Sequence, residues 1–237
     1  KTTTLYTMIR VLNKPDTNIM TAEDPVEYEL AGITQVAVKP LLGLTFEAVL
    51  RSFLRQDPDI MLVGEIRDLE TAEIAVKAAI TGHLVLSTLH TNSAPAAVTR
   101  MAHMGVATFL LADSVKMIIA QRLVRTLCGR CKKDAPLPDE VKRMLSEPEQ
   151  AVLARVWEAP GCPACGQSGY TGRMPIFEVM DVRSPEIRQR ILAAHGADEI
   201  AAQAVKEGMT PLRGAALAAV GRGETSLSEA LGVILSE

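Results

Sequence analysis

The stretch DPDIMLVGEIRDLETAEIAVKAAITGHLVLSTLHTN, residues 57–92, decides the fold class. It holds two short apolar runs, 60–63 and 84–89, separated by one segment of helical periodicity. Apolar runs of this length are typical of central strands in a parallel sheet that is buried on both faces. The first run leads to Glu65 and the second to His90. Because ligands bind beyond the carboxyl ends of parallel strands, we expect both side chains to lie at one ligand site.

Apolar periodicity, caps and turn residues predict further elements around this stretch. Helices are expected at 1–12, 45–56, 68–80, 94–104 and 109–124, and extended segments at 18–21 and 33–38. Alternating strands and helices imply an α/β core with a mainly parallel sheet covered on both faces.

The sequence changes in character after residue 126. Prolines and four cysteines interrupt the following stretch, which we expect to form a small inserted module. Later, a helix is expected to begin at Thr210-Pro211 and to end at Gly223, and Ser226 with Glu229 predicts a capping box for the last helix. The expected domains are a core at 1–126, a zinc-binding module at 127–175 and a mostly helical subdomain, opening with a short strand from 176, at 176–237.

Composition excludes several classes of protein. The 237 residues carry a formal net charge of −3 and only 3% aromatic residues, whereas a general nucleic-acid binder needs a basic surface and stacking side chains. Charged and polar residues break up the most apolar stretch, 109–123, so we expect no membrane span. We also recognise no signal peptide and expect a cytoplasmic protein.

All four cysteines fall in two CxxC pairs, Cys128 with Cys131 and Cys162 with Cys165. Two such turns supply four thiolates within tetrahedral reach of one ion, which is the pattern of a structural zinc site. A redox dithiol or an unligated pair of turns is the alternative. A shell of four thiolates leaves no open coordination position, so we expect this Zn²⁺ to be architectural.

The chain begins Lys1-Thr2-Thr3-Thr4, which matches the end of a phosphate-binding loop. We expect Lys1 to neutralise the β- and γ-phosphates of ATP, and Thr2, with Thr3 beside it, to bring a hydroxyl to Mg²⁺ at the amino end of a helix. Taken alone, these residues fit an ordinary helix start equally well. Glu65 is expected to hold Mg²⁺ through water or to polarise the attacking water, since Asp68 is better placed to cap the next helix.

Three further carboxylates follow the strand expected at 18–21. Glu23, Asp24 and Glu27 are assigned to the Mg²⁺ and water shell, because clustered carboxylates beside a triphosphate need a balancing cation. A solvated turn is the alternative. His90 is expected to sense the γ-phosphate or to link the site to the neighbouring helix, against the alternative of a satisfied interior histidine, and His83 has a similar but weaker case.

Arginines can match the negative charge that spreads in a phosphoryl-transfer transition state. Arg51 and Arg55 share one helix face, and Arg67 comes two residues after Glu65. Any of them could reach a nucleotide held by this subunit or by a neighbour. The alternative for the helix pair is a surface ladder that starts at Glu47.

Several of these segments resemble one known family. Residues 21–28 (TAEDPVEY) look like the aspartate box of the ATPases that drive type II secretion and type IV pilus assembly. Residues 54–68 resemble their Walker B segment and 81–92 their histidine box, and AQRLVR at 120–125 before Cys128 is also similar. The motifs occur in the family's order and cover nearly the whole chain.

The resemblance implies a RecA-like P-loop NTPase core that uses ATP and Mg²⁺. It implies a homohexamer in which an arginine is supplied across the subunit boundary. It also implies a motor at the cytoplasmic face of the inner membrane, held there through a platform protein. Composition argues against nucleic acid as a further partner. In this superfamily the tetracysteine module is typical of motors that extend a pilus or pseudopilus. The resemblance does not separate the pilus system from the secretion system.

One departure from the family concerns the phosphate loop. The glycine-rich residues that precede the lysine, and the amino-terminal domain, are not in this sequence, so we expect this chain by itself to bind ATP weakly. A zinc-bearing interaction module with an impaired nucleotide site is the first alternative function. A RecA-like nucleic-acid motor is the second, and the acidic balance disfavours it.

Overall fold

The computed structural model describes residues 1–153 and 155–234. The chain forms two compact units, each built from separate segments of sequence. The first contains Lys1–Thr91, Pro95–Met117 and Asp181–Gln203, and the second contains Asn92–Ala94, Ile118–Met180 and Ala204–Glu237. Both units draw on more than one of the three expected segments, and the three-domain division stays a prediction.

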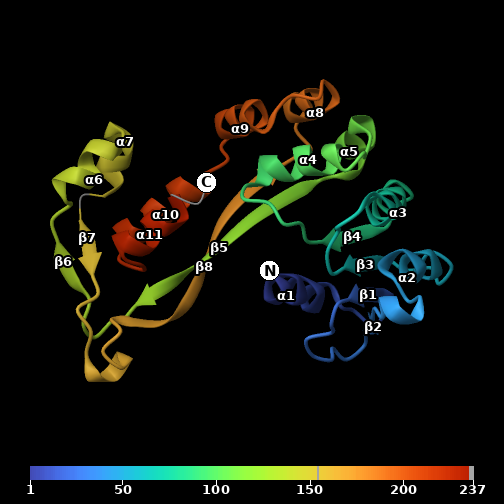
Figure 1. The fold of residues 1–237 in the computed structure, drawn as a ribbon, viewed down its shortest axis with the longest axis horizontal. Helices are drawn as coiled ribbons and strands as arrows, with labels where there is room; N and C mark the ends of the chain where they lie inside the picture. The colour runs from blue at the N-terminus through green and yellow to red at the C-terminus, as the bar shows by residue number, and fades with distance from the viewer. Residues whose placement is uncertain (154, 235–237) are drawn as a thin grey trace. The chain divides into compact units, whose positions relative to one another are not determined.

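A four-stranded parallel sheet forms the centre of the first unit. Its strands are β1 (Ile19–Glu23), β2 (Thr34–Ala37), β3 (Ile60–Val63) and β4 (Leu84–Ser87), in the order β2-β1-β3-β4. Ile60 and Leu62 pack with Ile9 of helix α1 (Thr2–Leu12), while Met61 and Val63 alternate to the other face and are also buried. In Figure 1, α1 lies on one side of the strands and α2 and α3 on the other. The predicted α/β fold with a parallel sheet is confirmed.

Two helices of this unit begin at side-chain caps, of which Asp68 was predicted. Helix α2 (Phe46–Phe53) starts after Thr45, whose hydroxyl accepts from the Ala48 N–H at 3.2 Å. Helix α3 (Leu69–Ile80) starts after Asp68, whose carboxylate accepts from the Thr71 N–H at 2.8 Å. The remaining elements up to residue 114 are the short helix η1 (Pro40–Leu42), α4 (Ala94–His103) and α5 (Thr108–Ser114). Further along the chain come α8 (Pro185–Leu192) and α9 (Ala197–Lys206).

The helix predicted at 109–124 is wrong. Helix α5 ends at Ser114, and the chain continues as strand β5 (Met117–Leu127), which pairs with β8 (Tyr170–Asp181). The strand expected from residue 176 accordingly starts at Tyr170. The segment is rich in β-branched residues such as Ile118 and Ile119, which favour a strand once a partner supplies the hydrogen bonds.

The second unit also holds a small antiparallel pair and two helices from the end of the chain. The pair is β6 (Lys133–Ala135) with β7 (Val156–Glu158), and helices α6 (Asp139–Met144) and α7 (Glu147–Val152) lie between them in sequence. A short helix, η2 (Pro163–Cys165), follows β7, and α10 (Leu212–Gly221) packs against α11 (Leu227–Ile234). Within the described residues, no helix is both long and apolar enough to cross a membrane.

Two carboxylates hold this unit together in ways that the sequence did not reveal. Glu178 on β8 is 3% exposed and accepts from the Ala94 N–H at 2.6 Å and the Leu212 N–H at 3.2 Å, so it caps two helices at once. The predicted capping box is half right. The Ser226 hydroxyl accepts from the Glu229 N–H at 3.3 Å, but the Glu229 carboxylate turns away to the Arg125 guanidinium at 2.8 Å.

Candidate nucleotide pocket and metal centre

A pocket of about 190 Å³ opens beyond the carboxyl ends of β1 and β3, beside the first turn of α1. Polar residues from four separate stretches line it. Among them are seven residues selected from the sequence: Lys1, Thr2, Glu23, Asp24, Glu27, Glu65 and His90. The structure therefore brings the expected phosphate-binding and carboxylate residues to one place, as expected for strand ends that meet at one edge of a sheet.

The basic wall of the pocket is the start of α1. The helix begins at Thr2, and the Lys1 ammonium donates to the Leu89 carbonyl at 2.6 Å. The N–H groups of a helix's first turn have no partner within the helix and favour anions. Thr2 lines the pocket, whereas Thr3 is not among the lining residues. A phosphate placed here would meet both the helix terminus and the Lys1 charge.

Glu65 is the partly exposed carboxylate on the opposite wall. Its side chain is 14% exposed, pairs with the Arg67 guanidinium and accepts from His90 Nε2 at 3.2 Å. The hydrogen bond from Arg67 holds the pKa of Glu65 below its usual value. Partial burial acts against this shift and His90 adds to it, so the carboxyl group is ionised at neutral pH. Thus Glu65 can accept a hydrogen bond from water or from a hydrated cation.

Backbone hydrogen bonds fix the position of this carboxylate. The Gly64 N–H donates to the Ala22 carbonyl at 2.8 Å, and the Ile66 N–H donates to the Thr88 carbonyl at 3.0 Å. A Cβ on Gly64 would lie 3.3 Å from that Ala22 oxygen, closer than most such contacts. The absence of a side chain at Gly64 therefore lets the ends of β1 and β3 approach closely.

Glu23 is buried more deeply than the sequence suggested. It is 3% exposed, and its carboxylate accepts from the hydroxyls of Tyr6 and Thr21 and from the Gln35 amide. The sequence did not single out these three partners. An aromatic residue on a helix usually indicates a core position, and polar residues in strands usually indicate an edge. A signal was available: Tyr6 lies four residues after Thr2 on α1, and Thr21 lies two before Glu23 on β1, each on the same face as its neighbour.

Four other selected residues lie outside the pocket lining. Arg51 pairs with Glu47 at 2.8 Å, and Arg55 donates to the Arg51 carbonyl, so both follow the surface-ladder alternative within this chain. Arg67 pairs with Glu65 and also interacts electrostatically with Asp24, both of which line the pocket. His83 Nδ1 lies 2.9 Å from the Ala78 carbonyl at the end of α3. A role for these arginines toward a neighbouring subunit stays a prediction.

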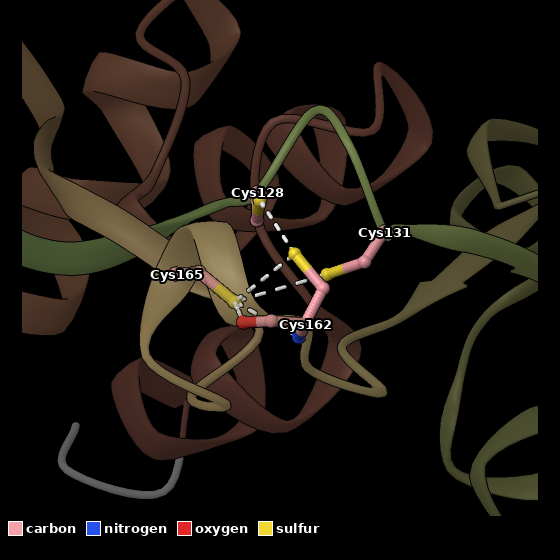
Figure 2. Close-up of side chains that lie close together, drawn as sticks. All are labelled: Cys128, Cys131, Cys162 and Cys165. Carbon is pink, nitrogen blue, oxygen red and sulfur yellow. Dashed lines mark hydrogen bonds between the residues drawn. The ribbon is translucent and has the colours of Figure 1, made fainter.

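The four cysteines form a compact cluster in the second unit. Figure 2 shows their side chains pointing toward one another from two turns, and all four sulfur atoms lie within 4.8 Å of one another. The separations are 4.0 Å for Cys128 to Cys162, 4.0 Å for Cys131 to Cys165 and 3.7 Å for Cys162 to Cys165. Zinc–sulfur bonds of about 2.3 Å in a tetrahedron require sulfur separations of about 3.8 Å. The cluster therefore fits a four-thiolate zinc site.

Backbone amides around the cluster favour thiolate sulfur. The N–H groups of Cys162 and Gly169 donate to Cys165 Sγ at 3.2 and 3.1 Å. Burial raises the pKa of Cys165, but these donors outweigh it and bring the pKa to about 6. Burial and neighbouring sulfurs raise the pKa of Cys131 to about 12, as expected when thiols compete for ionisation. A divalent cation would relieve that competition.

The fold and the two sites together define an α/β protein with a polar pocket at the strand ends and a separate tetracysteine cluster. A family model for type II/IV secretion system proteins matches residues 1–232. The chain belongs to this family, which confirms the resemblance drawn from its motifs.

Named relatives come from both branches of the family. The chain is 53% identical to the type IV pilus assembly ATPase PilB of Acinetobacter baylyi, over 97% of this chain and 40% of that protein. It is 46% identical to the type II secretion system protein E of Aeromonas hydrophila, over 98% of this chain and 46% of that protein. The chain thus spans less than half the length of these relatives.

Solved structures agree on the fold. A crystal structure of the pilus retraction motor PilT with bound ADP matches with a TM-score of 0.71 and 26% identity, over 98% of this chain and 57% of that chain. The ATPase DotB of Legionella pneumophila matches over 100% of this chain and 57% of its own, with a TM-score of 0.69. At 22% identity, the second match supports the fold alone.

Proposed function

We propose that this chain is the carboxyl-terminal motor part of a hexameric ATPase that drives type IV pilus assembly or type II secretion. The observation that carries the proposal is the convergence of Lys1, Thr2, Glu65 and His90 on one pocket with three further carboxylates. Relatives named as pilus assembly ATPases and as type II secretion proteins support it. Either machine is consistent with the residues in this chain.

Each pocket residue has a chemical task in this proposal. Lys1 and the first turn of α1 bind the β- and γ-phosphates, and Thr2 offers a hydroxyl beside them. The Asp24 and Glu27 carboxylates hold the hydration shell of the cation. Mg²⁺, when bound, supplies positive charge that neutralises the phosphates. Glu65, held by its partners on the other wall, orients and polarises the water that attacks the γ-phosphate, and His90 positions Glu65.

The rest of the machine lies beyond this chain. We propose that an arginine reaches the nucleotide of the neighbouring subunit, with Arg51, Arg55 and Arg67 as the candidates. The hexamer docks on a platform protein of the inner membrane from the cytoplasmic side. The tetracysteine cluster holds an architectural Zn²⁺, and its presence favours an assembly motor over a retraction motor.

The proposal is tested with Glu65→Gln in the full-length protein. We expect Mg²⁺-dependent ATP hydrolysis to fall at least about 100-fold, because the water loses its acceptor, while the affinity for a fluorescent ATP analogue changes less than about threefold. Glu70→Gln, an exposed glutamate on α3, is the matched control and should keep full activity. Undiminished hydrolysis by Glu65→Gln would rule out the assigned role, and stimulation by single-stranded DNA would favour a nucleic-acid motor.

A further inference from the structure

Glu23 is a carboxylate enclosed by neutral hydrogen-bond donors at the end of β1. Its Oε2 accepts from the Tyr6 hydroxyl, and its Oε1 accepts from the Thr21 hydroxyl and from Gln35 Nε2, the last at 3.1 Å. A buried carboxylate needs such donors, because removal from water is costly. These donors are neutral side chains, and Glu23 itself lines the pocket.

The three donors also restrict the direction in which Glu23 can act. An ionised carboxylate offers about four acceptor positions. Three are taken, which leaves about one for a donor in the pocket. Since both oxygens are bonded, the carboxylate cannot rotate without breaking a hydrogen bond. Glu23 is therefore held in one orientation and is suited to bind a single water molecule.

Gln35 has its own orientation fixed. The Leu30 N–H donates to Gln35 Oε1 at 2.6 Å, which turns the NH₂ group of the amide toward Glu23. A flipped amide would point one N–H at another and would place the carbonyl oxygen against the carboxylate. The hydrogen-bond network thus permits only one arrangement of Gln35.

Tyr6 joins the network to both walls of the pocket. It lies on α1, the helix whose start carries Lys1 and Thr2, and its hydroxyl accepts from the Glu27 N–H at 3.3 Å while donating to Glu23. Burial first, and then Glu23, raise the pKa of Tyr6 to about 12, so the phenol keeps its proton at neutral pH. Its ring is fixed by an edge-on contact with Tyr28 at a centroid distance of 4.7 Å.

We propose that Tyr6, Thr21 and Gln35 are positioning residues that hold Glu23 so that its remaining acceptor position binds a water molecule in the ATP pocket. This inference rests on the proposed function and adds to it a set of residues that act through Glu23. If the network only kept the sheet folded, its loss would lower stability and leave the kcat of the folded protein unchanged.

The test uses hydroxyl deletions in the full-length protein. Tyr6→Phe is expected to lower kcat about 10- to 100-fold with the KM for ATP within about twofold, because it removes a hydrogen bond to a charged group that matters in the transition state. Tyr28→Phe, the neighbouring ring, is the control and should leave kcat unchanged. Thr21→Val should lower kcat similarly, and Thr21→Ser, which keeps the hydroxyl, should restore it.

A double-mutant cycle separates positioning from structure. If Tyr6 acts through Glu23, the combination of Tyr6→Phe with Glu23→Gln should be no slower than Glu23→Gln alone. Multiplicative losses would overturn the inference. Thermal unfolding and the binding of a fluorescent ATP analogue, measured on each variant, should stay close to wild type, and a kcat loss that follows loss of folded protein would also overturn it.

The two proposals can fail separately. Unchanged hydrolysis in Glu65→Gln would refute the assigned function and this inference with it. Loss of activity in Glu65→Gln together with normal kcat in Tyr6→Phe would refute the inference alone.

Discussion

Two glycines near the tetracysteine cluster form a matched pair for substitution. Gly169 and Gly172 both have φ of +77°, which side chains rarely adopt. A Cβ on Gly169 would lie 2.5 Å from the Ala159 carbonyl oxygen, whereas a Cβ on Gly172 would meet nothing within 4 Å. Replacing either glycine by alanine therefore imposes the same backbone strain. Only the substitution at Gly169 also brings the new Cβ into collision with Ala159.

The expected magnitudes follow from that difference. The left-handed conformation costs an alanine about 1–2 kcal/mol at either position. At Gly169 the backbone must also move away from Ala159, and overpacking of this kind costs about 1–3 kcal/mol more. That movement strains two hydrogen bonds, from the Gly169 N–H to Cys165 Sγ and from the Cys128 N–H to the Gly169 carbonyl. We expect a loss of about 2–5 kcal/mol for Gly169→Ala and about 1–2 kcal/mol for Gly172→Ala.

Urea unfolding followed by tryptophan fluorescence measures both losses. Trp157 is the only tryptophan and lies on β7 in the same unit as the cluster. With a slope of about 2 kcal/mol per molar urea, the Gly169→Ala midpoint should fall about 1–2.5 M and the Gly172→Ala midpoint about 0.5–1 M. Metal content, read with a colorimetric chelator, should fall only in Gly169→Ala. Equal midpoints for the two variants would refute the argument from the collision.

Three further predictions concern buried or paired groups. Glu178→Gln should lower stability by about 2–4 kcal/mol in urea unfolding, because an amide cannot accept from both helix N–H groups, while exposed Glu158→Gln should have no effect. Hydrogen bonding to Arg213 lowers the pKa of Glu149 to about 2 from an ordinary 4.5, so the pair stabilises the fold above pH 4.5 and this contribution disappears as the pH falls toward 2. Arg213→Met should therefore cost about 1–2 kcal/mol at pH 7, discounted for exposure, and much less at pH 3; an equal cost at both pH values would contradict the pairing. A strong chelator should remove the metal and make all four thiols react rapidly with a thiol reagent, and rapid reaction before chelation would argue against a metal centre.

The features that depend on local spacing were predictable. Glu65 and His90 follow apolar strands of one parallel sheet, and the sheet rule alone places both at the same edge. Two CxxC pairs were sufficient to predict the cluster of sulfur atoms, because each pair closes a tight turn. The cap of α3 at Asp68 was predictable because the carboxylate binds an N–H only three residues further along the chain.

The features that depend on distant partners were not predictable. Residues 117–124 were expected to be helical, because the pairing strand β8 lies far along the sequence and no local window contains it. Glu178 looked like an ordinary strand residue until two helix termini were seen to converge on it. The Glu229 carboxylate accepts from Arg125, which is distant in sequence and close in space, and does not complete the capping box. In each case a long-range hydrogen bond outweighed a local preference.

Backbone hydrogen bonds at Gly64 and Ile66 limit which parts of the pocket can move. The backbone bonds from Gly64 to Ala22 and from Ile66 to Thr88 tie the segment that carries Glu65 to strands on both sides. The backbone that carries Glu65 therefore belongs to the rigid part of this unit and cannot move without breaking these hydrogen bonds. Any movement in the pocket must therefore come from other residues. The His90 side chain is 80% exposed, and those backbone hydrogen bonds do not restrain it. A fixed Glu65 backbone facing an exposed imidazole would let the pocket adjust to a ligand through His90 alone.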